Sequence, residues 1–144
     1  MFKKILVCLD GSPFAEQIIP YTVKLAQMFQ STLVLLRCVE LGEPEAYETV
    51  GSLEVADKVQ KEAIVYLERN AKLIQAEDIN TEFVTLQGTV ADNIVNYADK
   101  NEVDIIAIAT HGYGGFKRMI LGSVADQVVR NSTLPKLLIT PKVK

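Results

Sequence analysis

The stretch VDIIAIATHGYGGFKRMILGS, residues 103–123, decides how this chain is expected to fold. Its first seven residues are apolar apart from one aspartate, a pattern typical of a strand that is buried on both faces of a parallel sheet. Three glycines follow within four residues, and a Gly122-Ser123 pair then comes directly before a helical pattern. Glycine permits left-handed backbone angles and the close approach of a ligand, while the first N–H groups of a helix can bind phosphate oxygens. The stretch therefore predicts a strand, a phosphate-binding loop and a helix in succession.

A second interpretation of the same glycines stays open. In it, residues 112–115 form a tight surface turn and Ser123 only caps the helix, with Asp126 completing a capping box. The GxxxxGK[ST] phosphate loop is absent, and no dinucleotide fingerprint follows the first strand. Lys117 and Arg118 are able to reach a phosphate, but exposed basic residues on a surface turn are more often simply solvated.

The rest of the chain alternates between short apolar runs and helical patterns. We expect further strands at residues 4–9, 32–39, 81–86 and 136–140. One helix is expected to begin at Ser12-Pro13, and three more to cover residues 53–76, 89–100 and 123–130. Serine caps a helix well, proline fits its first position, and Thr89 and Asp92 have the spacing of a capping box. Strands that alternate with helices form a parallel sheet with helices on both faces. The sequence thus predicts a doubly wound α/β fold in which 103–109, the most hydrophobic run, is the central strand.

Two of the expected helices carry an apolar stripe that should face the sheet. In the helix that begins at Ser12, the stripe consists of Ile18, Ile19, Val23, Ala26 and Phe29. In the helix at 53–76, it consists of Val55, Val59, Ala63, Tyr66, Leu67 and Ile74. Residues 40–51, which precede that helix, are acidic and contain Gly and Pro, so we expect either a cover over a bound ligand or a surface segment.

Composition and charge limit the classes of function. The 144 residues are 49% hydrophobic and 23% charged, which is typical of one globular domain spanning residues 1–144. The net charge of −3 argues against broad binding to nucleic acid or anionic membranes, although a few backbone N–H groups can still hold an anionic ligand. The apolar run near the N-terminus is too short for a signal peptide or a membrane span, so we expect a cytoplasmic protein. Cys8 and Cys38 lie in apolar runs, where buried reduced thiols are expected.

Ligands of doubly wound folds bind beyond the carboxyl ends of the strands, near the point where the strand order reverses. The loops expected at those ends include residues 10–12, Gly88 and residues 110–122. Asp10 either contacts a ligand there or forms a turn with nearby N–H groups. His111, the only histidine, has no nucleophile or second metal ligand near it in sequence. Loop packing or a ribose-phosphate contact is therefore expected of it, rather than catalysis or metal binding.

Several of these features together resemble the universal stress protein family. The family's signature is Gly, two residues, Gly, nine residues, and then Gly-Ser or Gly-Thr, after the fourth strand. Here Gly112, nine residues and Gly122-Ser123 match it, while Ala109 occupies the leading glycine position. The first strand ends in Asp10, and the wording VDIIAIATHG is close to that of the family. The resemblance covers the whole chain and implies a five-stranded sheet of order 3-2-1-4-5, usually dimeric through the last strand.

The resemblance also implies roles for individual residues, taken from the ATP-binding members of the family. Leu9 and Asp10 would line the nucleoside, Cys38 would flank the adenine, Ala109 would lie at the ribose, and Gly112, Gly122, Ser123 and Val124 would hold the phosphates. Any Mg²⁺ would be carried by the phosphate oxygens, without a metal ligand from the protein. Because alanine is the smallest departure from glycine, Ala109 is expected to weaken nucleotide binding or leave it unchanged.

The leading hypothesis is an ATP-binding stress-response module that acts as a homodimer through Lys136 to Thr140. Hydrolysis would be slow at most, since the sequence offers no evident general base. A short apolar strand at a sheet edge also invites pairing with a second copy. The alternative is a structural or adaptor dimer that binds no nucleotide, in which Ala109 marks a drifting signature. A third hypothesis, an adenylating enzyme of the related nucleotide hydrolase and ligase superfamily, is disfavoured because CLDGSPFAE, residues 8–16, matches the pyrophosphate loop poorly.

Overall fold

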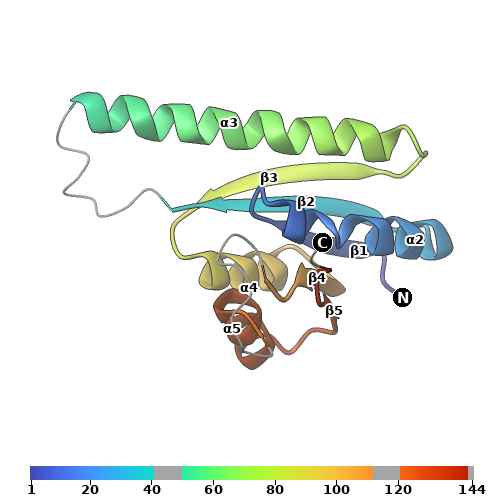
Figure 1. The fold of residues 1–144 in the computed structure, drawn as a ribbon. Coiled ribbons are helices and arrows are strands. Elements are labelled where there is room, and N and C mark those ends of the chain that lie inside the picture. The colour runs from blue at the N-terminus through green and yellow to red at the C-terminus, as the bar shows by residue number, and fades with distance from the viewer. Residues whose placement is uncertain (41–49, 112–120, 143–144) are drawn as a thin grey trace.

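The described part of the chain has the element order β1-α1-α2-β2-α3-β3-α4-β4-α5-β5 (Figure 1). The structure is a computed structural model and describes residues 1–40, 50–111 and 121–142. The strands are β1 Lys4–Leu9, β2 Thr32–Val39, β3 Thr81–Gln87, β4 Ile105–Ala109 and β5 Lys136–Ile139. The helices are α1 Pro13–Glu16, α2 Ile19–Phe29, α3 Val50–Gln75, α4 Val90–Lys100 and α5 Ser123–Asn131.

The strands form a five-stranded parallel sheet in the order β3-β2-β1-β4-β5, which confirms the doubly wound α/β fold and the order implied by the family resemblance. The expectation that residues 103–109 form the central strand is wrong, because β1 occupies the middle and β4 lies beside it. Five of the six residues of β1 are buried, as are all five of β4. A continuous hydrophobic run indicates that a strand is buried on both faces of the sheet. Because β1 and β4 are both buried in this way, hydrophobicity does not tell which of them is the middle strand.

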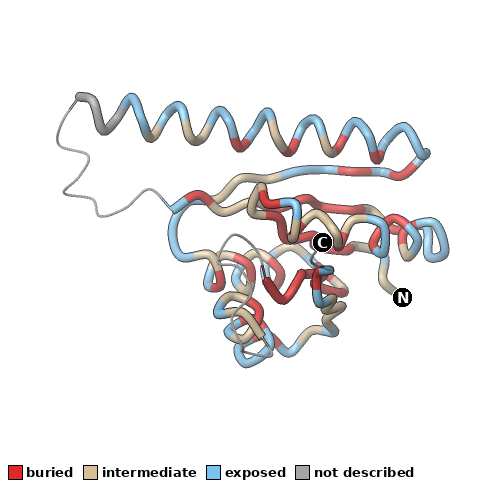
Figure 2. Tube along the Cα trace, in the orientation of Figure 1, coloured by how far each residue is buried: buried red, intermediate tan, exposed pale blue. Residues whose placement is uncertain are grey.

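Two apolar cores separate the sheet from its helices. One face of the sheet packs against α2 and α3, with α1 over β1 and β4, and the other face packs against α4 and α5. Successive side chains of a strand point to opposite faces, so Ile5, Val7 and Leu9 enter the first core while Leu6 and Cys8 enter the second. Figure 2 shows the buried residues concentrated in the strands and on the sheet-facing sides of the helices.

The helix expected to run on from Ser12 is interrupted. Ser12 caps it as predicted, since its Oγ accepts a hydrogen bond of 3.1 Å from the N–H of Ala15. The first helix nevertheless ends at Glu16, and α2 begins at Ile19 with Pro20 in its first turn. Proline has no N–H to donate to the carbonyl of Glu16, and its ring crowds that carbonyl, so a continuous helix is broken here.

The helix α3 extends well beyond the sheet that it covers (Figure 1). Its 26 residues span roughly 39 Å, whereas the seven residues of β3 span about 23 Å. Of the predicted stripe, Ala63, Leu67 and Ile74 are buried, but Val55 is 62% exposed because its part of α3 projects past the strands. Among the described helices, neither α3 nor any other is long and apolar enough to span a membrane.

The starts of α4 and α5 differ from their predicted caps. Thr89 is the N-cap residue of α4, but its side chain makes no capping hydrogen bond, so the predicted box with Asp92 is not formed. Gly122, and not Ser123, is the N-cap residue of α5, and the exposed Ser123 is the first helical residue. The strand expected from residue 103 begins at Ile105, and the other strand boundaries agree to within one residue.

Candidate functional site at the carboxyl ends of β1 and β4

The pairing between β1 and β4 ends before either strand does. The register pairs Val7 with Ala107 as its last step. Beyond that point β1 stays paired with β2 as far as Leu9 and Arg37, while β4 stays paired with β5 as far as Ala109 and Ile139. β1 and β4 therefore separate at their carboxyl ends, which is where the strand order of the sheet reverses.

A tight turn follows β1 at this position. The Oδ1 atom of Asp10 accepts a hydrogen bond of 2.8 Å from the N–H of Ser12, so Asp10 does form the turn that one interpretation predicted. Gly11 has a φ of +88°, a left-handed value that other residues rarely adopt. The turn leads into α1, which contacts both β1 and β4. The carboxylate of Asp10 thus lies beside the place where the strands separate.

The end of β4 and the start of α5 are fastened together. The N–H of Gly122 donates a hydrogen bond of 2.8 Å to the carbonyl of Thr110, whose own N–H donates to Ile139 at 2.8 Å. A Cβ atom on Gly122 would lie only 2.2 Å from that carbonyl oxygen of Thr110. Gly122 has a φ of −69°, so it is required by this close approach and not by an unusual backbone angle. The chain that leaves the sheet after β4 therefore returns to the same place, as the sequence predicted.

Two further predicted residues lie next to the ends of β4 and β2. His111 is buried, and its Nδ1 atom lies 2.9 Å from Oγ1 of Thr110, which fits loop packing. Cys38, one residue past the level of Leu9 in the β1–β2 register, is half-buried, and its thiol donates to the carbonyl of Val90 at 3.8 Å. Burial and the nearby Glu40 carboxylate raise the pKa of Cys38 to about 11. The thiol is therefore neutral and presents a weakly polar surface.

The predicted site residues differ in what they expose. Leu9 and Ala109 are buried, so their side chains pack within the protein. Val124 is half-buried against the core formed with α4, while Ser123 is exposed. Gly112, with its neighbours in the predicted phosphate loop, lies outside the described residues. The same holds for most of the acidic segment 40–51.

The part of the chain that the structure describes contains no cluster of three or more His, Cys, Asp or Glu side chains that could hold a metal ion. The thiols of Cys8 and Cys38 are both free, as expected from the sequence, and burial raises the pKa of Cys8 even further than that of Cys38.

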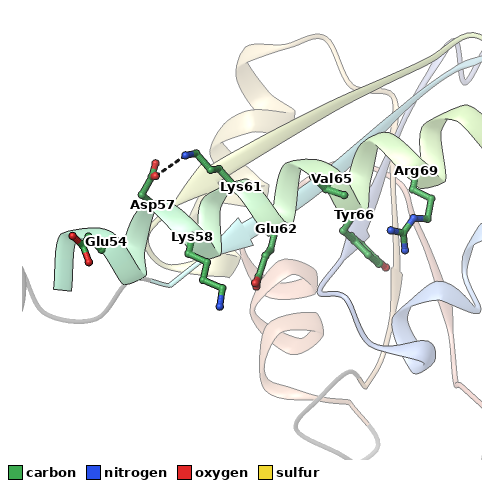
Figure 3. A pocket seen from close by; sticks show the side chains of 8 residues that line it. All are labelled: Glu54, Asp57, Lys58, Lys61, Glu62, Val65, Tyr66 and Arg69. Carbon is green, nitrogen blue, oxygen red and sulfur yellow. Dashed lines mark ion pairs between the residues drawn. The ribbon is translucent and has the colours of Figure 1, made fainter. Parts of the chain in front are cut away.

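A groove of about 630 Å³ runs along α3 from Glu54 to Arg69, and its described lining contains none of the predicted nucleotide-binding residues (Figure 3). Lys58, Glu62, Tyr66 and Arg69 point from α3 toward the body of the protein, while Asp57 and Lys61 form an ion pair on another side of the helix. The sequence predicts Tyr66 only as a core residue, and the prediction gives no role to Arg37, although a single cation within the apolar run TLVLLRCV is a local signal.

Comparison with known proteins assigns the chain to a family. Residues 1–140 match the sequence profile of the Universal stress protein family. Universal stress protein YxiE of Bacillus subtilis is 31% identical over 151 residues, which cover 96% of this chain and 99% of that protein. The solved structure of protein MJ0577 of Methanocaldococcus jannaschii is 27% identical, has a TM-score of 0.90, and covers 100% of this chain and 99% of its own.

More distant structures share the fold and were solved with nucleotides. One is a universal stress protein of Archaeoglobus fulgidus in complex with dAMP, at 20% identity and a TM-score of 0.69, covering 96% of this chain and 99% of its own. Another is a universal stress protein family member of Arabidopsis thaliana with AMP bound, at 14% identity and a TM-score of 0.73, covering 98% and 93%. Because the family profile matches residues 1–140 and YxiE is 31% identical over nearly its whole length, this chain belongs to the universal stress protein family.

Proposed function

We propose that this protein binds an adenine nucleotide, ATP in the first place, at the carboxyl ends of β1 and β4, and acts in the cytoplasm as a homodimeric stress-response module. The observation that carries the proposal is the early end of the β1–β4 pairing at the point where Gly122 fixes the start of α5. The family members solved with AMP and dAMP support an adenine nucleotide as the ligand class.

The groups around this position fit the parts of a nucleotide. The first N–H groups of a helix lack partners within it and carry the positive end of its dipole, so those of Ser123 and Val124 suit phosphate oxygens. The Asp10 carboxylate and the main chain of Leu9 would line the nucleoside, and the main chain of Ala109 would lie at the ribose. The neutral thiol of Cys38 would flank the adenine. Gly112 and Gly122 complete the proposed phosphate contacts.

The proposed contacts favour binding over turnover. Main-chain amides and a serine hydroxyl stabilise phosphate charge, but they do not take a proton from an attacking water at neutral pH. Mg²⁺ would be carried by the nucleotide's own phosphate oxygens. ATP hydrolysis, if any, should therefore be slow, and the output of the module would be a change in conformation or assembly.

The nucleotide proposal is tested by calorimetric titration with ATP, ADP and AMP in the presence of Mg²⁺. Ser123→Glu places a carboxylate where the phosphates would bind, although an acid in the first turn of a helix is otherwise favourable to stability. We expect it to weaken ATP binding strongly while the melting temperature stays the same or rises. Gln127→Glu, an exposed position one turn later on α5, is the matched control and should bind as the wild type does. A wild-type protein that binds none of the three nucleotides at millimolar concentration would favour the adaptor alternative.

The homodimer proposal rests on β5, which has β4 on one side only and lies at the edge of the sheet. Its free N–H and C=O groups suit pairing with the same strand of a second copy. Leu138→Lys should convert the dimer to a monomer in light scattering coupled to gel filtration, while circular dichroism stays native. Thr133→Lys adds the same charge at an exposed position outside the strand and should leave the dimer intact. A folded Leu138→Lys protein that remains dimeric would exclude this interface.

A further inference from the structure

Arg37 reaches from β2 onto the turn that follows β1. In the register of the sheet it lies beside Leu9 on one side and Thr85 on the other. A Cβ atom added to Gly11 would lie 3.0 Å from both Cζ and Nη1 of Arg37 and 3.1 Å from Nη2. The whole plane of the guanidinium group therefore covers Gly11, in the middle of the turn that presents Asp10.

Tyr66 holds the guanidinium group from α3. Cζ of Arg37 lies 5.0 Å from the centroid of the Tyr66 ring, which is within the range of a cation–π contact. Tyr66 projects from α3 toward the body of the protein (Figure 3). One and a half turns earlier, Gln60 donates a hydrogen bond from Nε2 to Oγ1 of Thr85 on β3, so α3 is held at this level of the sheet.

Burial, helped by nearby carboxylates, keeps the hydroxyl of Tyr66 protonated and its ring neutral. Burial raises the pKa of Tyr66, the carboxylates of Glu16 and Asp10 raise it further, and Arg37 opposes them. A neutral ring retains the electron-rich face that attracts a cation. The Tyr66 side chain of α3 thus lies near a cation from β2, the Asp10 carboxylate after β1, and Glu16 at the end of α1.

We propose that Arg37 is a positioning residue for the nucleotide site, clamped by Tyr66 so that α3 fixes how the turn at residues 10–12 presents Asp10. The part of this inference that concerns nucleotide rests on the proposed function, whereas the clamp itself concerns the nucleotide-free protein. Arginine is required because its guanidinium is planar and can lie flat between a ring and a glycine. Lysine carries the same charge on a compact, strongly hydrated group that cannot form this layer.

Two measurements test the clamp in the intact protein. The first is hydrogen exchange at the Ser12 amide, followed by NMR without nucleotide, because that N–H is bonded to Asp10. The second is the dissociation constant of AMP from calorimetry. Arg37→Met, Arg37→Lys and Tyr66→Leu should each speed exchange at Ser12 and weaken AMP binding by about tenfold, the scale of one desolvated cation–π contact. Tyr66→Phe keeps the ring and should leave both quantities at their wild-type values.

A control separates positioning from general loss of stability. Ile74→Val removes one buried methyl group from α3 at its far end, away from Arg37. It should lower the melting temperature and leave both Ser12 exchange and AMP affinity unchanged. If it instead matches Tyr66→Leu in both, the effect is one of helix stability and the clamp is refuted.

The remaining outcomes also decide the question. If Arg37→Lys has wild-type Ser12 exchange and AMP affinity, the positive charge alone is sufficient and the planar clamp is refuted. If Ser12 exchange is unchanged in Tyr66→Leu, α3 does not hold the turn and the clamp is likewise refuted. Weaker AMP binding in Arg37→Met with unchanged Ser12 exchange would mean that Arg37 contacts the ligand directly, against a positioning role. If the wild type binds no AMP, the proposed function fails, and Ser12 exchange in the nucleotide-free variants still tells whether the clamp exists.

Discussion

Gly122→Ala tests most directly how the chain closes after β4. The added Cβ atom would lie 2.2 Å from the carbonyl oxygen of Thr110, and real contacts of a Cβ atom are essentially never below 3.0 Å. One of the two backbones must therefore move by about 0.8 Å or more. That movement breaks or stretches the hydrogen bond of 2.8 Å between Gly122 and Thr110, and it displaces the first turn of α5.

The cost of this substitution follows from two terms. Loss of one buried hydrogen bond costs about 0.5–1.5 kcal/mol, and forcing extra volume into a close-packed position costs about 1–3 kcal/mol. Together they give about 1.5–4.5 kcal/mol, a large share of a stability that is typically about 5–15 kcal/mol. For a chain of this length, we expect the melting temperature to fall by about 5–15 °C.

Thermal unfolding and urea denaturation measure the effect of Gly122→Ala. Ser123→Ala is the matched control, because Ser123 is the exposed neighbour and its loss should change stability by no more than about 0.5 kcal/mol. At a φ of −69°, alanine would by itself stabilise the fold by about 0.4–1 kcal/mol through the unfolded chain. A Gly122→Ala protein that is as stable as the wild type, or more so, would therefore refute the close approach.

Two further predictions follow from burial. In urea denaturation, Leu67→Ala should lower the free energy of unfolding by about 2–5 kcal/mol, because Leu67 is fully buried. Val55→Ala on the same helix should lower it by less than about 0.5 kcal/mol, because Val55 is exposed. Equal losses of stability would contradict the projection of α3 past the sheet. Cys38 should react with iodoacetamide faster than Cys8, which is more deeply buried. Because only the thiolate reacts and the pKa of Cys38 is raised to about 11, the reaction rate of Cys38 should rise about tenfold per pH unit up to a pH near 11. A rate that levels off by pH 9, measured by mass spectrometry on the folded protein, would argue against that shift.

The strands could be predicted closely from the sequence, while some features of the helices could not. An apolar run bounded by turn residues carries its own limits, which is why the bounds of β1 and β2 agree with expectation. The interruption between α1 and α2 also has a local signal, since Pro20 stands where a continuous helix would need an N–H, but the predicted apolar stripe runs across it.

Other features depend on which distant parts of the chain pack together, and a local sequence pattern does not identify these. Helical periodicity identifies one face of α3, but the length of the sheet beneath it decides which turns of that face are covered. Val55 belongs to the stripe and is exposed for this reason. In the same way, Arg37 is a lone cation in an apolar strand, but its contacts with Gly11 and Tyr66 join residues from separate parts of the chain, which no local pattern identifies.

The glycine signature that led to the family combines physical demands of different kinds. At Gly122 the demand comes from the fold, because a side chain there would collide with the carbonyl of Thr110. At the leading position the fold makes no such demand, since Ala109 is the last residue of β4, pairs with Ile139 and is buried in ordinary strand structure. A glycine at that position can therefore matter only to what approaches the strand end from outside. The alanine found here leaves the architecture as it is and would bear only on how closely the proposed ligand is held, which is why the two positions must be tested by different measurements, affinity for Ala109 and stability for Gly122.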